Sequence, residues 1–290
     1  MKMPTGKFAI HRILVALDTS PQSLAALRAA IELAVKFQAQ LQGLFVEDID
    51  LLRLAGSPYA REVLLPTAKE MPLDRTSMER KLKAHSEQAR QALAKAADLA
   101  KVGWAFRVVR GSVSSEILAA TPDCDLLALG WRGWSLSKKS HVGSTASAAI
   151  SQAMPVLLVS SRGMITGVPV FVWYDGTLTS KRAVLAAAEL APIASQELTV
   201  LLPSLEPESD DHLQEQVMGL LREKGIRLKW ERVSCSDQAS LCNVLRSEPV
   251  SLIILTGQEP FPEPVSLVAG LDEIQISVLL LGEGPAFGLE

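Results

Sequence analysis

Three glycines and a serine form a cluster whose residue types and spacing suggest chemistry. They are Gly130, Gly133, Gly143 and Ser144, with the spacing G-x2-G-x9-G-S. Glycine lets backbone N–H groups approach an anion because no Cβ stands in the way. The largely apolar segment 125–130, which ends at the first glycine, has the length of a strand, and residues 145–150 favour a helix. A strand that leads through such a loop to a helix start is a common phosphate site, so we expect an anion site here, although each glycine could also serve only a turn.

Side chains near these glycines allow two interpretations each. Arg132, Lys138 and Lys139 either neutralise phosphate charge or are solvated loop charges. Ser144 either caps the following helix or donates its hydroxyl to a phosphate oxygen. Trp131 either shields a ligand or packs inside the protein. The sequence leaves these alternatives open.

Other ligand and catalytic motifs are missing from the sequence. It has no G-x4-G-K-[ST] loop, no G-x-G-x-x-G segment and no G-x-S-x-G elbow. Its four histidines are scattered and show no metal-ligand spacing. We therefore expect no metal-ligand residues and no catalytic residues.

The elements that must position the glycines alternate between strand and helix over residues 1–160. Strands are predicted at 13–17, 41–46, 104–109, 125–130 and 155–159, and helices at 23–37, 76–102, 113–120 and 145–150. Residues 49–75 match neither pattern and are interpreted as an insertion or a lid. This alternation predicts a doubly wound parallel sheet with ligands at the carboxyl ends of its strands.

The same order then begins again. With an offset of 157, Asp18 falls on Asp175, Ser23 on Ser180, and the Glu-Leu-Ala at 32–34 on that at 189–191. Such a repeat at domain length predicts an α/β protein of two tandem five-stranded domains, residues 1–160 and 168–284.

The second copy of the glycine segment is altered. Gly257 is aligned with Gly130, Pro260 with Gly133, and Leu271 with Ser144. Proline removes an N–H donor and fixes φ, so we interpret the second domain as degenerate and unfit for a nucleotide.

Together, these features resemble the universal stress protein family, and the glycine spacing resembles its ATP-binding branch. The resemblance implies that Asp18 and Val46 flank a nucleoside and that the glycine segment holds phosphates. One departure is Ala146, where family members often have a hydroxyl. The site residues implied in this way are Asp18, Val46, Leu129, Gly130, Arg132, Gly133, Gly143, Ser144 and Thr145.

Composition favours a globular protein in a reducing compartment. The chain has 290 residues, 48% of them hydrophobic, and no apolar segment of membrane-spanning length. Its first eleven residues lack the apolar core of a secretory signal, and its three cysteines cannot all pair. A cytoplasmic location is therefore expected.

Charge is divided unequally along the chain. Residues 1–160 carry 20 Lys and Arg against 14 Asp and Glu, whereas residues 161–290 carry 9 against 18. The difference is either drift or an attraction between the domains or toward partners. We expect the domains to dock face to face as an intramolecular pseudo-dimer, with their last strands (156–159 and 278–281) paired. A further homodimer stays open.

Three functional hypotheses follow. The first is a cytoplasmic stress-response regulator that binds ATP, with or without Mg, in its first domain. The second is an interaction-only stress module without nucleotide binding. The third is an ATPase. Its turnover would be slow because no general base can be assigned near the phosphates. Expected partners are an adenine nucleotide and an unidentified protein, and no nucleic acid.

Overall fold

A computed structural model gives the fold of the chain. It describes residues 8–57, 59–64, 69–131, 144–150, 154–164, 168–194, 197–204, 207–234, 238–256, 270–271 and 273–282. Within these ranges the predicted alternation of strands and helices is confirmed, and it occurs twice. We call the part from β1 to β7 the first half and the part from β8 to β12 the second half.

The first half holds seven strands, five α-helices and one short 3-10 helix among its described residues. They are β1 (Arg12–Ala16), α1 (Pro21–Phe37), β2 (Gln40–Asp48), α2 (Ile49–Ala55), β3 (Arg61–Leu64), β4 (Lys69–Pro72), α3 (Arg75–Ala100), β5 (Trp104–Gly111), α4 (Val113–Ala119), η1 (Thr121–Asp123), β6 (Leu126–Gly130), α5 (Ser144–Ile150) and β7 (Val156–Val159).

Among its described residues, the second half repeats this order without counterparts of α2, β3, β4, η1 and α5. Its described elements are β8 (Val170–Trp173), α6 (Leu178–Ala194), β9 (Glu197–Pro203), α7 (Pro207–Leu221), β10 (Arg227–Val233), α8 (Gln238–Ser247), β11 (Leu252–Thr256) and β12 (Ser277–Leu281).

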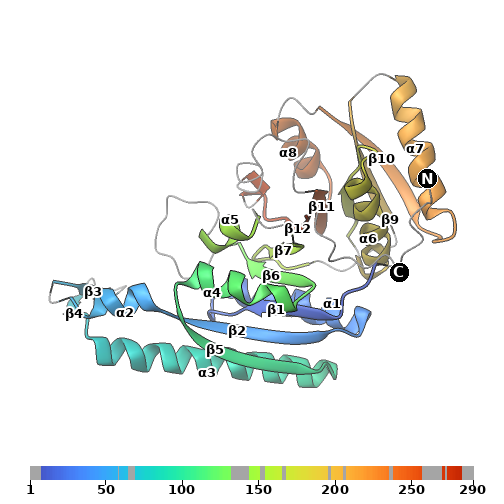
Figure 1. Ribbon diagram of the computed structural model, residues 1–290. Coiled ribbons are helices and arrows are strands. Elements are labelled where there is room, and N and C mark those ends of the chain that lie inside the picture. The colour runs from blue at the N-terminus through green and yellow to red at the C-terminus, as the bar shows by residue number, and fades with distance from the viewer. Residues whose placement is uncertain are drawn as a thin grey trace.

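Ten strands from both halves form one sheet, in the order β10-β9-β8-β11-β12-β7-β6-β1-β2-β5 (Figure 1). Within each half the strands are parallel. The strands nearest the middle are nearly all apolar and buried, as expected for parallel strands covered on both faces. The fold is therefore the predicted doubly wound α/β fold.

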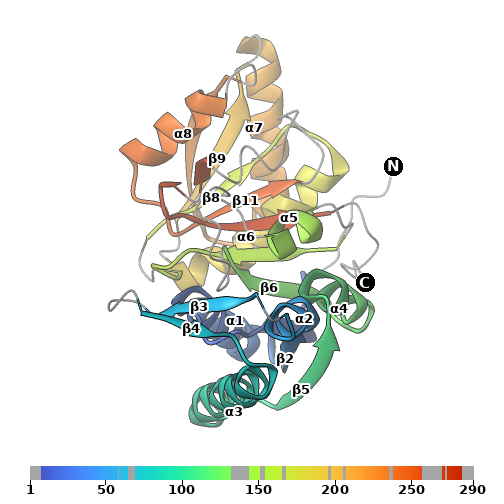
Figure 2. The ribbon, with the colours of Figure 1, turned by 90° about the vertical axis from the view of Figure 1, so that its left-hand side faces the viewer.

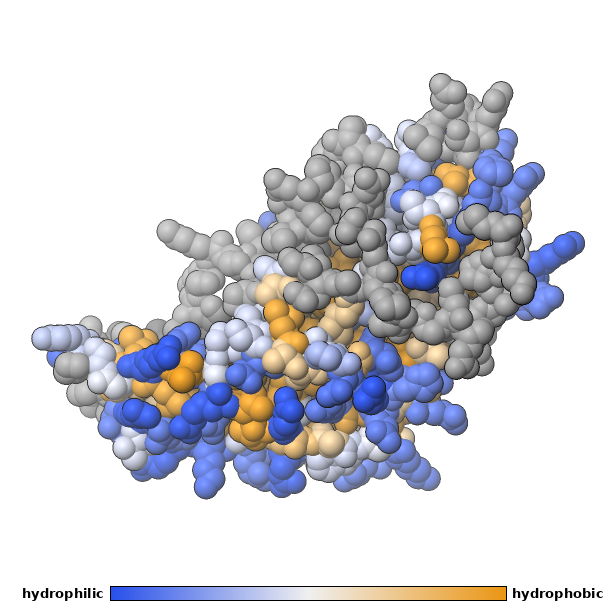
Figure 3. All heavy atoms as spheres, in the orientation of Figure 1, coloured by the Kyte–Doolittle hydropathy of each residue, from blue (hydrophilic) through white to orange (hydrophobic). Residues whose placement is uncertain are grey.

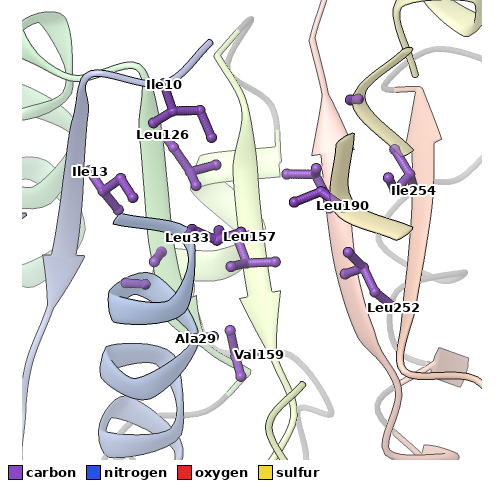
Figure 4. Close-up of a cluster of buried hydrophobic side chains, with 14 of the residues drawn as sticks. Ile10, Ile13, Ala29, Leu33, Leu126, Leu157, Val159, Leu190, Leu252 and Ile254 are labelled. Atoms are coloured by element: carbon purple, nitrogen blue, oxygen red, sulfur yellow. The ribbon is translucent and has the colours of Figure 1, made fainter. Parts of the chain in front are cut away.

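Helices cover both faces of the sheet. Helices α1, α3, α6 and α7 contribute to one buried cluster, while α4, α5 and α8 contribute to the other. Turning the molecule shows the second half stacked beyond the first along the sheet (Figure 2). The first cluster does not stop between the halves. Leu33 of α1 and Leu157 of β7 belong to the same cluster as Leu190 of α6 (Figure 4).

The two halves meet edge to edge through β7 and β12. These strands are antiparallel, with Leu157 opposite Leu279. The expected pairing of the last strands is thus confirmed, but the expected face-to-face docking is wrong. Pairing two open edges satisfies the backbone groups of both strands and extends one sheet, so the faces remain available to the helices. We call this junction the seam.

The segment after β2 is more regular than the sequence indicated. Residues 49–55 form α2, and residues 61–64 and 69–72 form the two-stranded sheet β3-β4. The carboxylate of Asp48 starts α2 by accepting the N–H of Asp50 at 2.8 Å, and Leu52 and Ala55 are buried. On the other side of α2, Leu51 and Leu54 are exposed, and hydrophobic side chains reach the surface at this end of the molecule (Figure 3).

Candidate functional site

The register of three neighbouring strands brings the predicted site residues to one edge of the sheet. Ala16 lies opposite Leu44, and Val15 lies opposite Ala128. The N–H of Leu17 continues the ladder by donating to the carbonyl of Leu44 at 2.9 Å. Asp18 therefore follows β1 at the level of Val46, and Gly130 ends β6 at the level just before Asp18. This edge holds the carboxyl ends of the strands, where ligands bind in doubly wound sheets.

Asp18 shapes the turn that leads into α1. Its Oδ1 accepts the N–H of Ser20 at 2.9 Å, and its own N–H donates to Ser23 Oγ at 3.4 Å. Ser20, not Asp18, caps the helix, because its Oγ accepts the N–H of Ser23 at 3.1 Å. Asp18 is half-buried.

The second half builds the same turn. Oδ1 of Asp175 accepts the N–H of Thr177 at 2.9 Å, and the N–H of Asp175 donates to Ser180 Oγ at 3.4 Å. Oγ1 of Thr177 accepts the N–H of Ser180 at 3.1 Å. Asp18 and Asp175 therefore share one structural role, and any ligand role of Asp18 comes in addition to it.

The two turns differ at their strained position. Thr19 has a φ of 66°, in the left-handed region, and its counterpart in the second half is Gly176 with a φ of 85°. A β-branched residue at positive φ is rare because its side chain collides with the backbone. Such strain often marks functional sites. Among the described residues, Thr19 is the one β-branched residue at positive φ, and it lies beside Asp18 in the half that carries the glycine segment.

Gly130 is required by close packing. A Cβ added to Gly130 would lie 2.7 Å from both the carbonyl carbon and the Cβ of Gln22, in the first turn of α1. Real side chains do not approach the backbone so closely. The first glycine of the predicted motif thus lets the end of β6 contact the start of α1, which is a packing role the sequence did not indicate.

Two helix starts are joined by hydroxyl groups at the same edge. Ser114 Oγ of α4 and Thr145 Oγ1 of α5 lie 3.2 Å apart. Ser114 was missed in the sequence, although serines follow the end of β5 just as they follow β1. The neighbouring Ala146 is 2% exposed and lies in the apolar cluster. A hydroxyl at position 146 would therefore lie in the apolar core. It would not lie beside the hydroxyls of Ser114 and Thr145 at the site edge.

Leu129 and Trp131 lie in the same apolar cluster. Leu129 is 4% exposed, so its side chain belongs to the core, and only its backbone reaches the site edge. Trp131 is 1% exposed, and its indole Nε1 donates to the carbonyl of Ile276 in the second half at 3.2 Å. The packing interpretation of Trp131 is therefore confirmed.

The cation next to this edge already has acidic partners. Arg110, at the end of β5, donates from Nε to Glu47 Oε2 at 2.8 Å, and its Nη1 lies 3.9 Å from Glu79 Oε1. The hydrogen bond that Arg110 donates to Glu47 raises the pKa of Arg110. Its charge is thus balanced locally, and a phosphate would need other cations.

The register also corrects the alignment of the second half. Leu126 pairs with Ile13 and Leu252 with Val170, so β6 and β11 are equivalent from these residues onward. Thr256, not Gly257, consequently stands where Gly130 stands. Aligning the two halves on their glycines gave the wrong equivalence, because the sequences after β6 and β11 differ. Strand pairing instead fixes which residues are equivalent. The first glycine of the motif has no counterpart in the second half.

Several predicted site residues lie outside the described part of the chain. They are Arg132, Gly133 and Gly143, together with Lys138 and Lys139; Ser144 is described only as the first residue of α5. Within the described residues, no group of three or more His, Cys, Asp or Glu side chains could hold a metal ion. No described helix has the length and apolar character needed to cross a membrane.

Comparison with known proteins places these features in context. The sequence profile of the universal stress protein family matches residues 9–160, which contain β1 to β7. No curated protein sequence matches the chain significantly.

Solved structures with the same fold cover both halves. A universal stress protein from Archaeoglobus fulgidus DSM 4304 is 17% identical with a TM-score of 0.67, and the similarity covers 94% of this chain and 97% of that one. A functionally unknown protein from Pseudomonas aeruginosa PAO1 is 15% identical with a TM-score of 0.54, covering 94% and 92%. At such low identity the similarity supports the fold alone.

Proposed function

Because this chain belongs to the universal stress protein family, we propose that it is a cytoplasmic stress-response regulator that binds ATP in its first domain (residues 1–160). In this proposal the second domain (residues 168–284) is degenerate and binds no nucleotide. In this proposal ATP is bound and is not cleaved. It acts as a signal, because the protein with ATP bound differs in state from the protein without it.

The observation that carries the proposal is the strand register at the site edge. Asp18, Val46 and Gly130 come from three segments far apart in the sequence, yet they lie at nearly one level near the carboxyl ends of three neighbouring strands. Thr145 adds a hydroxyl from α5, linked to Ser114. Asp18 and Val46 would hold the nucleoside, while Gly130, Thr145 and the residues between them would hold the phosphates.

Strain and asymmetry support a site in one half only. Thr19 holds a positive φ next to Asp18, where the second half uses Gly176. Thr256 replaces Gly130 at the equivalent strand end, and Glu259 and Glu263 add negative charge in the segment that follows. A phosphate is repelled by such carboxylates.

The proposal is tested by calorimetry with ATP on the full chain and on two matched variants. We expect one site per chain. Asp18→Ala and Asp175→Ala remove the same turn contact, so both should lower stability to the same degree. Only Asp18→Ala should weaken ATP, by about ten- to a hundredfold if its carboxylate bonds to the nucleoside. Two sites, or equal affinity losses in both variants, would contradict the proposal.

Selectivity for the triphosphate would come from the cations that follow Gly130. Replacing Lys138 and Lys139 by alanine should weaken ATP more than AMP, because the extra charge of ATP lies at its terminal phosphates. Raised salt should narrow the gap between the two ligands. Equal losses for ATP and AMP would identify the lysines as solvated charges.

The matched turns of Asp18 and Asp175 favour one alternative, an interaction-only module. If Asp18 only shapes its turn, as Asp175 does, neither half binds nucleotide and the surface is read by a protein partner. The calorimetric experiment separates the two, since such a module gives no heat with ATP.

A further inference from the structure

Trp131 is the first residue after β6 and connects the glycine segment to the second half. Its backbone N–H donates to the carbonyl of Val159 in β7 at 3.3 Å. Its indole N–H donates to the carbonyl of Ile276, directly before β12, at 3.2 Å. Trp131 thus bonds to one strand of the seam, β7, and to the residue that leads into the other, β12.

The indole is held by burial as well as by this hydrogen bond. Trp131 is 1% exposed and belongs to the cluster that contains Ala146 and Ala149 of α5 and Ile276 and Leu271 of the second half. Helix α5 follows the glycine segment, so the residues before and after that segment meet the second half in one apolar core. A buried indole N–H is costly to leave unpaired, which favours the observed position of the ring.

The neighbouring Gly130 connects the same point to the nucleoside end of the site. Its Cα packs against Gln22 in the first turn of α1, where a Cβ would not fit. The first turn of α1 directly follows residues 18–20, where Asp18 Oδ1 accepts the N–H of Ser20. A displacement of Trp131 would therefore be transmitted through Gly130 to the start of α1.

The link is one-sided. By strand register, Thr256 of β11 is the equivalent of Gly130. The sequence continues with Gly257 where the first half has Trp131, and glycine has no side chain that could make a matching contact.

We propose that Trp131 is a positioning residue through which the second half sets the position of Gly130 at the carboxyl end of β6 and, with it, the affinity of the first half for its nucleotide. This rests on the proposed function, and it assigns a role to the degenerate half: it is a fixed support for the site. Because coupling between two regions is reciprocal, ATP binding should in turn stabilise the seam.

The first test compares two full-length variants. Trp131→Phe keeps an aromatic ring but removes the N–H donor. The control Ser277→Ala removes seam hydrogen bonds to the Ser160 N–H (3.2 Å) and the Gly163 carbonyl (3.0 Å) at neighbouring positions, while both hydrogen bonds of Trp131 keep their partner atoms. Both should lower the unfolding midpoint. Only Trp131→Phe should weaken ATP in calorimetry, by about two- to tenfold, the value of one hydrogen bond.

The second test uses the wild-type chain and hydrogen exchange read by mass spectrometry, with and without ATP. We expect ATP to slow exchange in peptides covering residues 274–281 as well as residues 126–131. This measurement decides the question alone if Trp131→Phe does not fold.

The outcomes separate this inference from the proposed function. If wild-type protein gives no heat with ATP, the proposed function fails, and the inference built on it fails with it. If wild-type protein binds ATP but Trp131→Phe binds equally well, or residues 274–281 exchange at the same rate in both states, only the coupling through Trp131 is refuted. An equal loss of affinity in Ser277→Ala would likewise refute a specific role of Trp131.

Discussion

The strained Thr19 allows a test in which two matched substitutions should move stability in opposite directions. Thr19 and Gly176 occupy equivalent positions after β1 and β8, with φ values of 66° and 85°. Thr19→Gly removes the side chain that disfavours this conformation. Gly176→Thr introduces the same side chain at the equivalent place in the second half.

The expected sizes follow from backbone energetics. A non-glycine residue in the left-handed region costs roughly 1–2 kcal/mol. Introducing glycine costs about 0.5–1 kcal/mol through the added freedom of the unfolded chain. Thr19→Gly should therefore stabilise the protein by about 0.5–1 kcal/mol. Gly176→Thr should destabilise it by somewhat more, because its Cβ would also lie 3.0 Å from Leu213 Cδ2.

Urea unfolding followed by circular dichroism measures both changes, and an unchanged slope shows that the free energy alone has moved. Calorimetry on Thr19→Gly adds the functional side. The looser turn should weaken ATP, because Asp18 is no longer held in place before binding. A destabilised Thr19→Gly variant would refute the reasoning, since it would show that the threonine side chain contributes more than its backbone strain costs.

Four further predictions follow from the described contacts. Gly130→Ala should destabilise the protein by about 1–3 kcal/mol in urea unfolding, because the added Cβ clashes with Gln22. The control Gly219→Ala in α7, where an added Cβ meets nothing within 4 Å, should be neutral or stabilising. Equal effects of the two substitutions would contradict the packing role of Gly130. Ala146→Ser should lower the melting temperature by burying a hydroxyl and leave ATP affinity no stronger in calorimetry, and a gain in affinity would place residue 146 at the phosphates. Burial raises the pKa of Cys124 to about 11. The stability that the neutral thiol contributes should therefore be complete below about pH 9 and be lost between about pH 9 and 11. Cys124→Ala should flatten that part of the curve of unfolding free energy against pH. A chain ending at residue 164 leaves β7 unpaired and should self-associate in light scattering, while a monomer would show that the seam is dispensable.

Most of the fold could be predicted because apolar periodicity and the internal repeat are written locally in the sequence. The apolar run that begins at Ile13 supplies the buried residues of β1, and the offset that links Asp18 to Asp175 links two turns with the same hydrogen bonds. The full extent of helix α2 could not be predicted because its seven residues depend on burial of Leu52 and Ala55. Short helices owe most of their stability to such tertiary contacts.

The candidate site could be predicted only where a residue type signals its own role. Asp18 after a strand and the glycine spacing are signals of this kind. That Gly130 packs against Gln22 and that Trp131 bonds to Ile276 depends on contacts between residues far apart in the sequence. The equivalence of Thr256 with Gly130 depends likewise on strand register, which loops of unequal length hide.

The antiparallel seam has a consequence for how the protein is made. Strand β7 is synthesised about 120 residues before its partner β12. At roughly 5–20 residues per second on the ribosome, the first half waits about 6–24 s with that edge open. Neighbouring nascent chains on one messenger RNA carry the same open edge during that interval. Translation speed through the second half, and chaperones that cover the edge, therefore influence the yield of monomeric protein.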